Sequence, residues 1–173
     1  MPSLQRCFDF LELTRRWLFF LTVSLWFGGF LFYTAFVVPV GNDVLGSALD
    51  QGMITRLVTH NLNAVNVIAL FALAWDVAAT WRAMCLRMRV TQIVMFLLVA
   101  VGLALLVWLH PQLDAMIDPV KVSVSDRAAF RPIHRWYLRV STIQWAAMLI
   151  YIAVMLVAWR KKDGTKVVGD GQV

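Results

Sequence analysis

The sequence predicts an all-α integral membrane protein, a four-helix bundle that forms one transmembrane domain over residues 1–173. Composition is the first reason: 61% of the residues are hydrophobic and 15% are charged, whereas soluble domains are about half apolar and about a quarter charged. The second reason is a set of four apolar runs, each close to the roughly 20 residues that a helix needs to cross the hydrocarbon layer. Helices are expected because lipid offers no hydrogen bonds to a free backbone.

The predicted spans are residues 17–38, 62–81, 90–109 and 140–159. The first is expected to end at Pro39, and the third at His110 and Pro111, because proline disrupts the hydrogen bonds of a helix. Residues 161–173 follow the fourth span and are predicted to be a frayed polar tail.

Lys and Arg residues near the span ends predict the orientation, because cytoplasmic loops carry an excess of both. Three segments are basic: the one before the first span, the link between the second and third spans, and the one after the fourth. Their basic residues are Arg6, Arg15, Arg16, Arg82, Arg87, Arg89, Arg160, Lys161, Lys162 and Lys166. Both termini are therefore predicted to be cytoplasmic. The link between the third and fourth spans opposes this orientation, because it carries Arg127, Arg131, Arg135 and Arg139.

The three histidines of the chain fall at the predicted outer face, where the ends of a compact bundle would bring them close together. They are His60, His110 and His134, and Asp114 follows His110 at the spacing of one helical turn. Neutral imidazole is a common metal ligand, and a carboxylate often orients it. The hypothesis is a copper or zinc ion, or a haem, held by His60, His110, His134 and Asp114. The alternative is that water, lipid headgroups and the backbone satisfy these histidines.

Polar side chains in the second and fourth spans predict a pocket that opens outward. Asn63 and Asn66 share one helical face, and Gln144 in the fourth span is expected to contact Asn66. Hydrogen bonding between helices is the alternative role of the asparagines. Asp76 is the one acid within a predicted span, and it would pair with a cytoplasmic arginine such as Arg82 or act in a proton or cation relay.

Helical spacing also predicts which faces are buried. In the second span the small and polar face is Asn66, Ala69, Leu73, Asp76 and Thr80, and in the fourth span the matching stripe is Ser141, Gln144, Met148, Tyr151 and Met155. Ser24 and Gly28 form a small-residue pair suited to close helix packing in the first span, and Gly29 adds to it. The third span is expected to serve as scaffold.

Three segments carry a resemblance to a known family: LWFGGFLFYTAFVVPVG at 25–41, ITRLVTHNLNAVNV at 54–67 and FRPIHRWYLRVSTIQW at 130–145. They resemble a family of small four-helix bacterial membrane proteins of unknown function, which is similar to the copper-resistance-D-like (CopD-like) superfamily. Trp26 with Gly28, and His134 with Tyr137, are the motifs that match. The resemblance implies a bundle in the bacterial inner membrane with a role in metal or haem handling. The haem-binding branch has a histidine ahead of the tryptophan–glycine motif, and residues 14–18 contain none.

Three hypotheses on function follow. The leading one is a non-enzymatic multi-pass membrane protein whose outer pocket binds or passes a metal ion or small solute. The second is a haem-dependent membrane oxidoreductase, and the third is a structural or assembly subunit that binds another membrane protein or a copy of itself. The lipid bilayer is the expected partner, because the basic residues lie beside apolar runs and favour membrane anchoring over nucleic acid. No nucleophile elbow, Walker loop or zinc-protease motif is present, so no catalytic residue is predicted.

Overall fold

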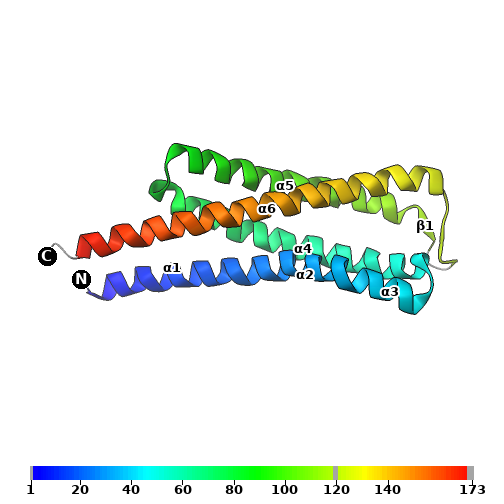
Figure 1. Ribbon diagram of the computed structural model, residues 1–173, viewed down its shortest axis with the longest axis horizontal. Coiled ribbons are helices and arrows are strands. Elements are labelled where there is room, and N and C mark those ends of the chain that lie inside the picture. Colours follow the sequence, from blue (N-terminus) through cyan, green and yellow to red (C-terminus); the bar gives the residue numbers. More distant parts are fainter. Residues whose placement is uncertain (1, 119–120, 171–173) are drawn as a thin grey trace.

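The computed structural model describes residues 2–118 and 121–170, and their backbone forms four long helices side by side (Figure 1). Each helix contains a segment long and apolar enough to cross a membrane, namely Phe10–Leu45, Ala48–Thr80, Leu86–Asp114 and Arg127–Gly164. The prediction of an all-α four-helix bundle is therefore confirmed, and the chain is a multi-pass membrane protein by the length and composition of its helices.

Helix one is built from five consecutive pieces: α1 (Pro2–Val23), η1 (Ser24–Gly28), α2 (Gly29–Phe32), η2 (Tyr33–Val37) and α3 (Val38–Leu45). The pieces η1 and η2 are π turns, in which the helix widens locally. The predicted end at Pro39 is wrong. Pro39 lies in the first turn of α3, where a missing N–H is tolerated. The helix ends instead at Gly46, whose φ of 64° is left-handed and whose N–H donates to Asn42 O at 3.0 Å.

The other three helices also extend beyond the predicted spans. They are α4 (Ala48–Thr80), α5 (Leu86–Asp114) and α6 (Arg127–Asp170), with the short 3-10 turn η3 (Trp81–Ala83) after α4. Pro111 does not stop α5, because it sits only one turn before the end of the helix. The predicted polar tail is helical as far as Asp170. Apolar runs mark only the part of a helix that lies in hydrocarbon, so helices that continue into the interface are longer than their apolar runs.

A small hairpin joins α5 to α6. Its strands are β1 (Ile117–Asp118) and β2 (Ser123–Val124), which pair antiparallel with Ile117 opposite Val124. Figure 1 places this hairpin and the α3–α4 turn at one end of the bundle, and both termini with the α4–α5 link at the other. We call these the hairpin end and the termini end.

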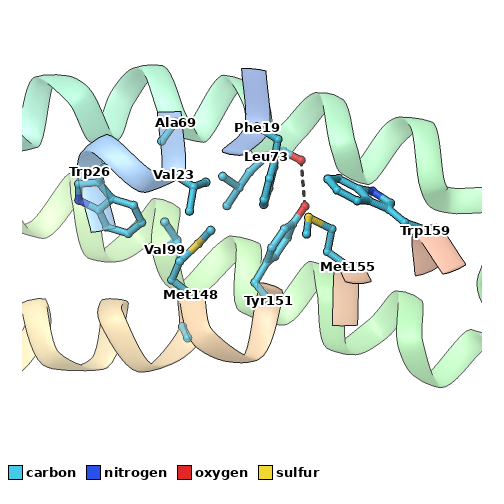
Figure 2. Packing of buried hydrophobic residues seen from close by; sticks show 11 residues of the cluster. Phe19, Val23, Trp26, Ala69, Leu73, Val99, Met148, Tyr151, Met155 and Trp159 are labelled. Atoms are coloured by element: carbon cyan, nitrogen blue, oxygen red, sulfur yellow. Dashed lines mark hydrogen bonds between the residues drawn. The ribbon is translucent and has the colours of Figure 1, made fainter. Parts of the chain in front are cut away.

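The core runs along the middle of the bundle (Figure 2). Helix one packs chiefly along α4, and α5 packs along α6. The two predicted stripes are confirmed, because every member of the α4 face and the α6 stripe is buried. Large apolar side chains such as Phe71 and Trp108 point outward instead, as expected of a surface that faces lipid.

The predicted small-residue packing in helix one is confirmed for Gly29 and wrong for the Ser24–Gly28 pair within this bundle. Ser24 and Gly28 are exposed, and a methyl group added at Gly28 would meet nothing within 4 Å. Gly29 is the glycine that packs, because a Cβ there would lie 3.3 Å from Leu62 Cδ2. Farther along, Gly41 leaves room for the amide of Gln51, which a Cβ would overlap.

Candidate functional site

Asp76 is fully buried in the half of α4 nearer the termini end, and it is bonded by side chains of the other three helices. Its Oδ1 accepts hydrogen bonds from Arg15 Nη1 on helix one and from Trp159 Nε1 on α6, the latter at 2.8 Å. Its Oδ2 lies 3.3 Å from both Tyr151 Oη on α6 and Gln92 Nε2 on α5. One carboxylate therefore joins all four helices.

These contacts decide part of what the sequence left open. A charge buried in a membrane helix is costly unless it is paired, and the partner of Asp76 is Arg15, of which 2% is exposed. Arg82, the other candidate, is exposed. Gln92 was not predicted to belong to the site, because the third span is expected to serve only as scaffold. Its amide nitrogen lies 3.3 Å from Asp76 Oδ2, Thr80 Oγ1 and Tyr151 Oη.

The chain of charges continues from Arg15 to the surface at the termini end. Arg15 Nη2 is 2.5 Å from Glu12 Oε1, and Glu12 Oε2 accepts from Lys162 Nζ at 2.7 Å. Arg16 binds Asp163 with both terminal nitrogens, at 2.6 and 2.8 Å. We call this set the charge network; its members are Glu12, Arg15, Arg16, Asp76, Lys162 and Asp163. Among the described residues it joins three acids to three bases.

Trp159 sits at the centre of this network. Besides its bond to Asp76, its ring lies under the guanidinium groups of Arg15 and Arg16, whose Cζ atoms are 5.3 and 4.9 Å from the ring centroid. Cations favour the face of an indole ring. Phe19 and Phe20 meet the same ring edge-on, with centroids 5.7 and 5.5 Å away. Aromatic contacts therefore reinforce the ionic link between helix one and α6.

A cavity of about 520 Å³ lies at the opposite, hairpin end of the bundle. Its wall includes residues of helix one, α4, α5, α6 and both hairpin strands. Within it, Arg56 Nε is 2.8 Å from Asp114 Oδ1, and His110 Nε2 is 3.6 Å from Asp114 Oδ2. Tyr33 Oη donates to Thr55 Oγ1 at 2.9 Å on another part of the wall. Small-molecule sites typically measure about 300–1,000 Å³, so this cavity has the size of one.

The structure brings only some of the predicted metal ligands together. His110, Asp114 and His134 line the cavity. His60 is exposed and lies beside it, with its ring centroid 5.8 Å from that of His110. The ring of His134 stacks on Phe130 at 5.4 Å. Among the residues that the structure describes, no three His, Cys, Asp or Glu side chains are grouped so that they could hold a metal ion.

The predicted pocket residues lie deeper than the cavity. Asn63 Nδ2 donates to Tyr137 Oη at 3.1 Å, and Asn63 and Gln144 line a second, much smaller cavity of about 20 Å³, room for about one water molecule. The predicted contact of Gln144 with Asn66 is wrong, because Gln144 Nε2 donates to Val99 O at 2.9 Å. Asn66 is fully buried, and among the described residues neither its Oδ1 nor its Nδ2 has a hydrogen-bond partner. Asp76 belongs to the charge network and lines neither cavity.

Comparison with known proteins gave no relative: no family model, curated protein or solved structure matches this chain. The functional argument therefore depends on the two features just described, the cavity at the hairpin end and the charge network at the termini end.

Proposed function

We propose that the protein binds a small organic solute in the cavity at the hairpin end and does so without catalysis. The observation that carries this proposal is the size of the cavity, about 520 Å³, together with the Arg56–Asp114 pair in its wall. Ligand sites are mostly apolar hollows with a few polar groups that fix the orientation of the ligand. The cavity follows this pattern, because aromatic and aliphatic side chains surround the ion pair and His110.

The polar groups in the wall favour a solute that both donates and accepts hydrogen bonds. Arg56 offers donors and Asp114 offers acceptors, and side-chain exposures of 31% and 27% leave both able to reach a ligand. Tyr33 and Thr55 add hydroxyl groups on the facing helices. A metal ion fits less well, because the ligand groups in the described residues are not grouped around one point.

The orientation supports a cavity on the outer side of the bacterial inner membrane. Most of the Lys and Arg residues that flank the spans lie at the termini end, and such segments favour the cytoplasm, whereas Arg127, Arg131, Arg135 and Arg139 lie at the hairpin end. The hairpin end would then face outward. This location is part of the proposal.

Native mass spectrometry of the purified protein tests the binding. Wild type should retain a solute from the expression host at about one copy per chain. Leu138 lines the cavity and is half exposed, so Leu138→Trp should lower the retained mass by filling the space. Ile143→Trp is the matched control, because Ile143 lies on the same helix, is 55% exposed and does not line the cavity. Equal retention in both variants would refute the assignment of the site.

A role as an assembly subunit is the second candidate, and one observation favours it. Ser24 and Gly28 are exposed on the membrane-spanning surface, with open space at Gly28 where another helix could approach. If this surface binds a partner, Gly28→Leu should abolish a stoichiometric complex in mild detergent, whereas Ala104→Leu at an exposed position of α5 should retain it.

A further inference from the structure

We propose that the protein moves its solute across the membrane. The two ion pairs that join helix one to α6 at the termini end, Arg16–Asp163 and Glu12–Lys162, would form the closed gate. This inference rests on the proposed function, because the solute would bind in the cavity before it is transported. The structure would then be one of two states, open at the hairpin end and closed at the termini end. Transport of this kind requires the two ends to open alternately around one site.

The contacts between helix one and α6 differ at the two ends of the bundle. At the termini end Arg16 binds Asp163, and Glu12 binds Lys162, so ion pairs hold the two helices together. At the hairpin end both helices line the cavity, helix one with Thr34 and α6 with Leu138 among other residues. Figure 1 shows that the axes of the two helices diverge toward that end.

Helix one has the features expected of the moving element. Its π turns, Ser24–Gly28 and Tyr33–Val37, both lie between the charge network and Asn42 at the far end of the cavity. Sharp bends in helices often occur at such turns. In the described residues, α4, α5 and α6 carry no π turn. Helix one also packs chiefly on α4, whereas α5 packs both on α6 and on α4.

The two parts of the charge network suit different roles in such a movement. The Arg15–Asp76 pair is at most 2% exposed and joins helix one to α4, its packing partner, so it can serve as the pivot. The pairs to α6 are closer to water, with side-chain exposures of 24% for Lys162 and 53% for Asp163. Partly exposed ion pairs add little net stability, because water solvates the separated charges well. The two ion pairs to α6 can therefore open at small cost while the pivot holds, and Trp159 of α6 remains bonded to Asp76 at that pivot.

The interior between the two ends already contains polar groups without partners. Within the described part of the chain, both amide atoms of Asn66 lack a hydrogen-bond partner, and Gln92 Oε1 is buried without one next to Asp76. Between them the apolar side chains of Leu73, Val99 and Met148 close the bundle (Figure 2). Buried polar groups normally find partners. These positions are therefore where a passing solute or water would be bound once helix one tilts.

Cysteine reporters test the movement without knowledge of the solute. In a Cys7→Ser, Cys85→Ser background, Thr80→Cys reports on the termini end and Ser141→Cys on the cavity; both parent residues are buried. The gate is weakened by Lys162→Gln with Asp163→Asn, both on α6, so that the pivot stays intact. Arg160→Gln is the control, because it removes a neighbouring charge of α6 outside the network. Labelling rates with a charged methanethiosulfonate reagent are measured in nanodiscs, where both faces are accessible.

Opposite changes at the two reporters are the expected result. Weakening the gate should speed labelling of Thr80→Cys about tenfold and slow that of Ser141→Cys, because a small loss of pairing energy shifts a two-state population strongly. The Arg160→Gln control should change neither rate. Faster labelling at both reporters would mean that the bundle has merely loosened, and unchanged rates would mean that the network is no gate; either result overturns the proposal.

The same data separate this inference from the proposed function. Opposite changes without any retained solute would refute solute binding and, with it, transport, while leaving the movement of helix one established. A retained solute with no opposite changes would support binding and refute transport alone.

Discussion

Replacing Asp76 by alanine should destabilise the bundle more than any surface change of similar size. The substitution leaves Arg15, which is 2% exposed, without its main partner, and breaking a buried ion pair in this way costs about 3–5 kcal/mol. The indole N–H of Trp159 also loses its acceptor at 2.8 Å, which adds about 1–3 kcal/mol. Glu12 still binds Arg15 at 2.5 Å and offsets part of the loss. We therefore expect a net loss of about 3–5 kcal/mol in the free energy of unfolding.

The assay is reversible unfolding by sodium dodecyl sulfate in mixed micelles, followed by circular dichroism. Asp163→Ala is the matched control, because it also removes an acid bonded to an arginine, but one whose side chain is 53% exposed; such a pair contributes about 0–1 kcal/mol. Adding Arg15→Met to Asp76→Ala should recover part of the loss, because no buried charge then remains unpaired. An Asp76→Ala protein within about 1 kcal/mol of wild type, or equal to the control, would refute the reasoning.

Three further predictions concern other parts of the molecule. The backbone N–H of Met88 holds the pKa of the exposed Cys85 thiol below its ordinary value. Cys85 should therefore react with maleimide near neutral pH faster than a model thiol does, and its reaction should slow as the pH falls through that pKa. In intact cells, an impermeant maleimide should reach Cys85 only if the termini are not cytoplasmic. Gly41→Ala would place a methyl group on the amide of Gln51 and should cost about 1–3 kcal/mol in unfolding experiments, whereas Gly28→Ala has open space and should be neutral or stabilising. Because we expect an organic ligand in the cavity, elemental analysis and absorption spectra of untagged protein should give less than one equivalent of copper, zinc or iron and no haem band. A stoichiometric metal would instead support a metal site at the histidines.

The spans and their buried faces could be predicted because both depend on local signals. Apolar runs fix the membrane-crossing part of each helix, and helical spacing correctly identified a face containing Asn66 and Asp76. The helix ends could not be predicted from the same signals. Pro39 lies in the first turn of α3, where proline is tolerated, and Pro111 lies inside α5, which continues for one more turn, so neither ends its helix.

The candidate site was predicted less completely, because it depends on contacts between distant residues. Asp76 was recognised as an acid within a span, but its pairing with Arg15 requires the packing of helix one on α4. Gln92 had a usable signal, since a strongly polar side chain inside an apolar span needs a partner. The cavity had no local signal, because it arises where helix one and α6 diverge. The spacing of Glu12 to Arg15 and Arg16 was likewise a signal that went unused.

The π turns of helix one have a consequence for how this segment tolerates insertions and deletions. A π turn is equivalent to an α-helical turn with one residue inserted. Deleting one residue within Tyr33–Val37 would restore a regular helical turn, and the residues beyond it would keep their orientation, because the wide turn already absorbs the extra residue. Gly41 would then still face Gln51, and helix one would present the same side chains to the cavity. Deleting one residue from a regular stretch of helix one would instead rotate everything beyond it by about 100°. The π turns are therefore where this segment can lose one residue and keep the same bundle, the same charges and the same cavity wall.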